Sequence, residues 1–189
     1  MARPRRNEDD GSAIESSTIG VYRTAATVKG GRRFSFSSMV VCGDRDGRVG
    51  IGYGKANQVP PAIEKAQKKA RRAMRLYPRT GSTIPHEVTG RFGACSVRLV
   101  PASPGTGVIA SSSVRALLEL FGVSDCLTKA FGSTNPKNMV KAVLDGLSQL
   151  RDRDQIEALR KISLPRTHHE DAHAAPPVAE EPAEEVASS

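Results

Sequence analysis

The sequence predicts an α+β fold built from two units with polar tails. Short apolar runs separated by glycine turns precede one long amphipathic helix, which indicates a first unit of three strands and a helix over residues 18–77. A break at residues 78–81 is followed by a second series of strands and helices, which indicates a two-layer α/β unit over residues 82–160. At 189 residues the chain is long enough to bury a core.

The strands of the first unit are expected at residues 19–28, 33–41 and 49–54, where apolar side chains recur. Lys29-Gly30-Gly31-Arg32 reads as the first turn, and the Asp46-Gly47 pair, which tolerates positive φ, as the second. Glycine at every other position of the third strand leaves one face bare. We therefore expect a helix or another backbone to pack closely there.

The helix of the first unit is expected from about Gln58 to Leu76, with two prolines in its first turn, where missing N–H groups cost little. Small and apolar residues from Val59 to Met74 follow one helical face. The rest of the surface is strongly basic, and Glu64 is the one acid available as a partner within the helix. The cations are Lys65, Lys68, Lys69, Arg71, Arg72 and Arg75. This imbalance favours an RNA-facing surface over a merely solvated one.

In the second unit, strands are expected at residues 84–89, 95–100 and 126–131. Helices are expected at residues 112–121 and 137–150, the first ended by a C-cap glycine, Gly122. Asn135 or Thr134 is expected to cap the second helix, with Pro136 at its first position. Residues 151–164 are expected to add a short helix.

The ends of the chain differ in charge from its middle. Residues 1–17 are predicted to be a disordered arm, and residues 165–189 a disordered acidic tail. Residues 170–189 carry −6, and subtracting this from the overall +8 leaves +14 on residues 1–169. Such an excess is typical of nucleic-acid binding. No stretch resembles a membrane span or a signal peptide, so a soluble cytosolic protein is expected.

No catalytic, cofactor or metal site is predicted. Gly50 to Lys55 lacks the spacing of a nucleotide-binding loop. The three cysteines, Cys42, Cys95 and Cys126, are far apart and are expected to be buried thiols. His168, His169 and His173 lie in the acidic tail, where a fixed metal geometry is not expected.

The glycine loop before the helix at 112–121 allows two interpretations. Gly105-Thr106-Gly107 running into Ser111 could present backbone N–H groups to an anion, as in small-molecule kinases of the galactokinase and homoserine-kinase type. The glycines could equally make only a tight turn.

Several motifs, taken together, resemble the family of bacterial small-subunit ribosomal protein five. They occur in order over residues 18–160: TVKGGRRFSF at 27–36, GRVGIGYGKA at 47–56, the basic helix, PASPGTG at 101–107 and KAFGSTNP at 129–136. The resemblance implies a first unit similar to a double-stranded-RNA-binding fold and a second unit related in fold to those kinases, without kinase activity. Ala26, where a lysine is common, and Asn57-Gln58, in place of a usually charged pair, depart from the pattern.

The resemblance also implies partners and contact residues. The expected partners are small-subunit ribosomal RNA, ribosomal proteins four and eight, and messenger RNA near the path by which it enters the subunit, with a supporting role in decoding accuracy. The RNA-binding residues expected from the resemblance and from the charge pattern are Arg23, Lys29, Gly30, Gly31, Arg32, Arg33, Lys55, Lys65, Lys68, Lys69, Arg71 and Arg72. The resemblance implies that Gly105, Thr106, Gly107 and Arg115 face protein four. No membrane and no small-molecule substrate is expected.

Two other functions fit parts of the sequence. A free-standing regulator that binds duplex RNA would share only the first unit. A small phosphotransferase would use the loop at Gly105.

Overall fold

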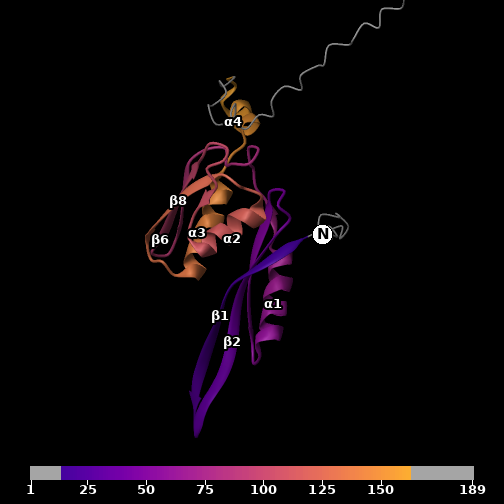
Figure 1. Cartoon of the computed structure of the whole chain (residues 1–189), viewed down its shortest axis with the longest axis vertical. Coiled ribbons are helices and arrows are strands. Elements are labelled where there is room, and N and C mark those ends of the chain that lie inside the picture. The colour runs from indigo at the N-terminus through magenta and orange to yellow at the C-terminus, as the bar shows by residue number, and fades with distance from the viewer. Residues whose placement is uncertain (1–13, 163–189) are drawn as a thin grey trace, which may run out of the picture.

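The computed structural model describes residues 14–162, which form two four-stranded sheets and four helices (Figure 1). The first sheet has the order β1-β2-β3-β4 and is antiparallel throughout. Its strands are β1 (Glu15–Val28), β2 (Gly31–Gly43), β3 (Arg48–Ala56) and β4 (Arg75–Leu76). The second sheet has the order β5-β6-β8-β7. The α+β class predicted from the sequence is therefore confirmed.

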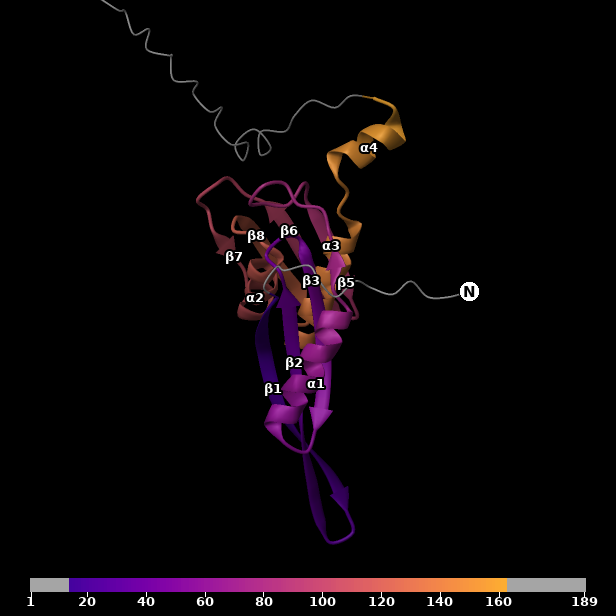
Figure 2. The same ribbon diagram turned by 90° about the vertical axis from the view of Figure 1, so that its right-hand side faces the viewer.

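The β1–β2 hairpin extends well beyond the rest of the first sheet (Figures 1 and 2). Pairing between β1 and β2 continues to Val28 and Gly31, whereas pairing between β2 and β3 stops at Phe36 and Ala56. The part of the hairpin beyond Phe36 is consequently a two-stranded ribbon. It stands away from the body of the protein and exposes both its faces.

Helix α1 (Val59–Arg72) packs on the glycine face of β3, as the sequence predicted. A Cβ added at Gly50, Gly52 or Gly54 would lie well inside 3.0 Å of the α1 backbone, where real Cβ atoms essentially never sit. On the helix, the buried residues that meet these glycines are alanines: Ala62, Ala66 and Ala70. Small residues on both sides bring helix and sheet into backbone contact.

Two boundaries in the first unit differ from the prediction. Helix α1 ends at Arg72, not near Leu76, because Arg75 and Leu76 pair with the edge of β3 as β4. This strand pairing overrides the helical pattern of the sequence. Residues 15–17, expected to belong to a disordered arm, form the start of β1 opposite the buried end of β2. The remainder of that predicted arm, residues 1–13, lies outside the described part of the chain, as do Pro165 and the acidic tail.

The second sheet contains β5 (Val88–Phe92), β6 (Cys95–Pro101), β7 (Val108–Ile109) and β8 (Cys126–Gly132). The strand predicted at residues 84–89 instead spans Val88–Phe92, because Pro85 lacks an N–H group and Ile84 is buried within a loop. Strand β7 was not predicted. It pairs in parallel with β8, and α2 (Ser112–Phe121) connects the two strands.

Helices α2 and α3 (Pro136–Gln149) cover one face of the second sheet (Figure 1). Their ends confirm the predicted caps: Gly122 adopts φ 95° after α2, and the Asn135 side chain accepts a hydrogen bond from the Lys137 N–H before α3. Helix α4 (Arg153–Arg160) follows within the predicted range 151–164 and has no buried residue.

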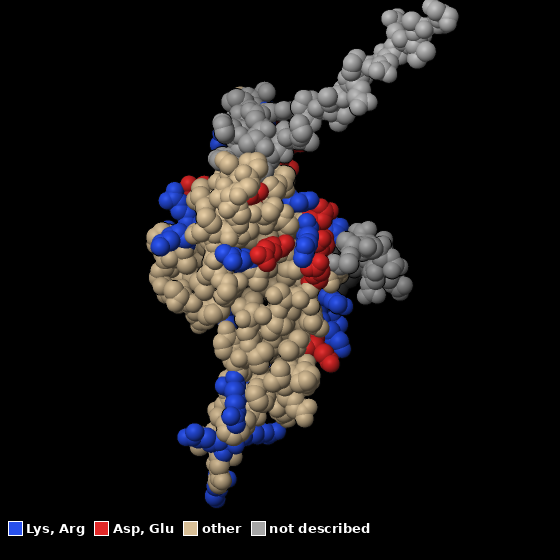
Figure 3. All heavy atoms as spheres, viewed as in Figure 1, with Lys and Arg blue, Asp and Glu red and all other residues tan. Residues whose placement is uncertain are grey.

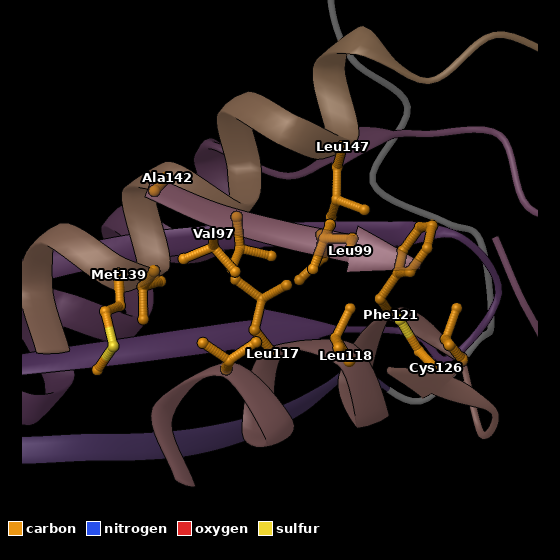
Figure 4. Packing of buried hydrophobic residues seen from close by; sticks show 14 of the residues in the cluster. Val97, Leu99, Leu117, Leu118, Phe121, Cys126, Met139, Ala142 and Leu147 are labelled. Atoms are coloured by element: carbon orange, nitrogen blue, oxygen red, sulfur yellow. The ribbon is translucent and has the colours of Figure 1, made fainter. Parts of the chain in front are cut away.

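One hydrophobic core joins the two units (Figure 4). Leu117, Leu118 and Phe121 of α2 pack against Val97 and Leu99 of β6 and the inner face of α3 (Figure 4). The same cluster includes three residues of the first sheet, Met39, Val41 and Val49. Val40 and Cys42 point to the opposite face, toward α1. The part of β2 from Met39 to Cys42 is thus buried on both faces, between α1 and the second unit.

The three cysteines are buried and free, as expected. Within residues 14–162 no helix is long and apolar enough to cross a membrane.

Candidate nucleic-acid interface

The tip of the hairpin is a two-residue turn, Lys29-Gly30, and Gly31 already belongs to β2. Gly30 adopts φ 99°, a conformation that side-chain-bearing residues rarely adopt, so glycine is required by the turn itself. Gly31 has ordinary φ, and a Cβ added there would meet nothing within 4 Å. The protein's own packing therefore leaves open space at this position, as the predicted close approach to a partner requires.

Four cations of the hairpin are exposed: Arg23, Lys29, Arg32 and Arg33. The Arg23 guanidinium carbon lies 3.7 Å from the centroid of the Phe34 ring in a cation–π contact. The ring itself remains 43% exposed. The ribbon thus carries an aromatic surface among its positive charges.

A pocket of about 410 Å³ lies where the hairpin leaves the body of the protein. We call it the hairpin-base pocket. Three elements contribute a cation to its lining: Arg33 from β2, Lys55 from β3 and Lys65 from α1. Its other lining residues are Ala26, Phe34, Ser35, Ala56 and Asn57. Both Ala26 and Asn57, where the chain departs from the family pattern, therefore belong to this pocket.

The cations of α1 continue this surface away from the hairpin. Lys65, Lys68, Lys69, Arg71 and Arg72 are all exposed, because the opposite side of the helix is the alanine face buried on β3. Arg75, which was expected to extend the helix, is exposed on β4. The helix packing thus directs the predicted charge outward.

Most of these cations lack a carboxylate partner within residues 14–162. Ion pairs in that part of the chain occupy other arginines, such as Arg45 with Glu15 and Arg98 with Glu87. Among the described residues, no ion pair involves the hairpin cations, Lys55, or the α1 residues from Lys65 to Arg71. Figure 3 shows lysine and arginine side chains gathered around the projecting hairpin with no acidic residue beside them on this face.

In the glycine loop between β6 and β7, two of the amides expected to face an anion already have partners within the protein. The Gly107 N–H donates to the Asp125 carboxylate at 3.0 Å, and the Thr106 N–H donates to the Ser103 carbonyl at 3.2 Å. Asp125 is buried and also accepts a hydrogen bond from the Ser82 hydroxyl at 2.9 Å. The sequence interpretation of this loop as a tight turn is the one that the hydrogen bonds favour.

Arg115 lies on the exposed side of α2, where it lines an open pocket of about 650 Å³. Arg45 from the β2–β3 turn and Glu119 from α2 line the same pocket. Val108, next to Gly107, is part of the lining, whereas Gly105 and Thr106 are exposed in the adjoining loop. The residues expected to face protein four thus lie on one side of the second unit.

Sequence reasoning missed two features of this surface. Lys137, at the start of α3, places its ammonium 4.5 Å from the Tyr22 ring and 4.7 Å from the Tyr53 ring, so it links the second unit to the first sheet. The exposed side of the second sheet carries Arg98 and Lys129 opposite each other on β6 and β8. A lysine at the start of a helix and single cations in strands form no sequence pattern, so their positions on the surface become visible only in the folded structure.

No group of three or more histidine, cysteine or acidic residues able to hold a metal ion occurs in the described part of the chain. The tail histidines lie outside it.

Comparison with known proteins assigns both units. Residues 14–76 match the model of ribosomal protein S5, N-terminal domain, and residues 90–160 match that of ribosomal protein S5, C-terminal domain. The small ribosomal subunit protein uS5 of Rhodopirellula baltica is 51% identical over 163 residues, which cover 85% of this chain and 92% of the relative. That of Rubrobacter xylanophilus is 54% identical over 163 residues, covering 86% and 81%.

The two domain matches occur in order and cover most of the chain. They define its class, a structural, non-enzymatic protein of the small ribosomal subunit. Within this class the chain belongs to the ribosomal protein S5 family. The resemblance identified from the sequence is thereby confirmed. The match over residues 90–160 contradicts a regulator that shares only the first unit, and the family assignment contradicts a phosphotransferase.

Proposed function

We propose that the chain binds small-subunit ribosomal RNA through the β1–β2 hairpin, the hairpin-base pocket and the outer side of α1. The observation that carries this proposal is the concentration of cations on the hairpin and α1, most of which form no ion pair within residues 14–162, while other arginines there do. Bringing so many like charges together is unfavourable unless a polyanion compensates them. The order of three strands followed by a helix also fits the double-stranded-RNA-binding architecture expected from the resemblance.

The finer assignments are proposals of the same kind. We place messenger RNA, near the path by which it enters the subunit, against Arg23 and the α1 cations. We place ribosomal protein four against Gly105, Thr106, Gly107 and Arg115, a contact through which the chain supports decoding accuracy. Ribosomal protein eight is the further proposed neighbour. The exposure of Arg115 and the open pocket beside it support the contact with protein four.

The RNA surface is tested by the salt dependence of binding to small-subunit RNA. On a B-form duplex, each phosphate contact contributes about 0.9 to the slope of log affinity against log salt concentration, and we use the same value for duplex RNA. Replacing Arg32 and Lys69 by alanine should therefore flatten the slope by roughly 1.8. The matched control replaces Arg45 and Arg98, which removes the same charge from residues already in ion pairs. A slope unchanged in the first variant would mean that Arg32 and Lys69 face solvent.

The contact with protein four is tested separately. Arg115→Ala should weaken binding of purified protein four to the chain and raise misreading in a translation assay. Glu119→Ala, which alters the same pocket without removing the cation, is its control. Normal protein four binding by the Arg115 variant would contradict this assignment and leave the RNA surface unaffected.

A further inference from the structure

We infer that the hairpin-base pocket binds a single unpaired nucleotide of RNA, its base stacked on Phe34 and its phosphates held by Arg33, Lys55 and Lys65. This inference rests on the proposed function, because it names the RNA element that the same surface takes.

The shape of the pocket favours one nucleotide over a duplex. A duplex presents a convex outline with its bases stacked inside, so it can lie across a concave site but cannot fill it. A nucleotide that has left the stack can enter, and RNA is read mainly through such unstacked bases. The volume, about 410 Å³, lies within the range typical of small-ligand sites.

The charge of the pocket favours a phosphate-bearing ligand. Its lining includes three basic residues from three different elements, and it contains no acidic residue. Helix α1 begins just beyond the pocket, but Pro60 and Pro61 in its first turn lack N–H groups. The cationic side chains, rather than the helix amides, therefore have to bind the phosphates.

The remaining lining residues suit a nucleobase. The Phe34 ring is partly exposed, and because Arg23 covers one of its faces, a base would stack on the other. The Asn57 side-chain amide can both donate and accept hydrogen bonds at the edge of a base. Ala26, Ser35 and Ala56 are small and leave room beside the ring.

The test compares the affinity of the full-length protein for two RNA hairpins, one perfectly paired and one with a single-nucleotide bulge, at one salt concentration. The wild type should bind the bulged RNA about tenfold more tightly, within the range that one base–aromatic stack supplies. Phe34→Leu should abolish this preference, because it removes the stacking ring while every cation remains. Phe131→Leu, which alters an exposed phenylalanine on the second sheet, should retain the preference.

The outcomes separate the two levels of the proposal. Equal binding of both RNAs by the wild type, or a preference that survives in Phe34→Leu, would overturn the nucleotide pocket alone. Failure to bind either RNA would contradict the proposed function. Free adenosine monophosphate, titrated in parallel, should bind at least tenfold more weakly than the bulged RNA, because it lacks the flanking phosphates. Equal affinity for it, lost in Phe34→Leu, would make the pocket a mononucleotide site and overturn the RNA assignment.

Discussion

The backbone N–H of Gly47, in the turn between β2 and β3, donates to the carbonyl oxygen of Phe121, the last residue of α2, at 3.0 Å. The Arg45 N–H donates to the carbonyl of Leu120, also at 3.0 Å. Carbonyl groups in the last turn of a helix have no partner within the helix. Here the first unit supplies those partners, so the end of α2 and the β2–β3 turn hold each other in place.

Gly122 is the residue that makes this contact possible. It has φ 95°, and a Cβ added there would lie well inside 3.0 Å of the Arg45 carbonyl oxygen. Gly122→Ala should therefore lower the free energy of unfolding by roughly 2–5 kcal/mol, since it combines left-handed strain with steric overlap. Chemical denaturation followed by circular dichroism would measure this loss.

The control for Gly122 is Gly93, in the β5–β6 turn. It also has positive φ, 57°, but an added Cβ would meet nothing within 4 Å. Gly93→Ala should cost only the backbone strain, about 1–2 kcal/mol. Equal losses in the two variants would show that packing against the first unit contributes nothing.

A second glycine pair tests the contact between α1 and β3. At Gly52 an added Cβ would lie well inside 3.0 Å of the Ala66 carbonyl oxygen, whereas at Gly31 it would meet nothing, and φ is ordinary at both positions. Gly52→Ala should therefore push α1 away from the sheet and lower the free energy of unfolding by about 1–3 kcal/mol. Gly31→Ala should leave thermal stability within about 0.5 kcal/mol of the wild type. A stable Gly52 variant would contradict the close packing.

The two positions also show how far the sequence alone could lead. The alternating glycines of β3 predicted a bare face and a helix that covers it, because α1 follows β3 directly in the sequence. The end of α1 was predicted wrongly, because β4 forms through pairing with β3 and not through its own two residues. The hairpin-base pocket could not be predicted, since Arg33, Lys55 and Lys65 meet only after the strands have set their register.

The buried thiols give a pH-dependent prediction. Burial raises the pKa of Cys126 to about 11 and also raises the pKa values of Cys42 and Cys95. At pH 8 only about one Cys126 in a thousand is then a thiolate, the reactive form. A thiol reagent should leave Cys126 of the native protein unmodified at pH 8, because the thiol is both buried and protonated. Rapid modification at pH 8 would show that the thiol is accessible.

The same shift makes the protein less stable in alkali. The folded-state pKa of Cys126 exceeds its ordinary value of 9.0, so its protonated form is favoured by folding. This contribution to stability is complete below pH 9 and is lost as the pH rises toward about 11. Cys126→Ala should flatten the pH dependence of the unfolding midpoint in that interval, even though the variant starts from a lower stability.

Lys137 offers a test of the contact between α3 and the first sheet. A hydrogen bond with Ser37, and then the positive charge of Lys137, lower the pKa of Tyr53. Lys137→Met keeps most of the side-chain length but removes the charge, so it should raise the pKa of Tyr53 toward 10.0, its ordinary value. Because the folded state favours the ionised tyrosine, the wild type gains stability as the pH rises through the folded-state pKa toward 10, and the variant should gain less.

The measurement is an NMR titration of ring-labelled tyrosine, with Lys141→Met as the control. The Lys141 ammonium lies 4.5 Å from the Phe92 ring, so its removal deletes a comparable cation–π contact on the same helix without touching a tyrosine. Thermal unfolding should show that the free energy of unfolding falls by about 0.5–1 kcal/mol for each ring contact removed. The fall should be larger for Lys137→Met, because the wild-type Lys137 ammonium contacts two rings. If both variants left the Tyr53 titration unchanged, Lys137 would not hold the second unit against the first sheet.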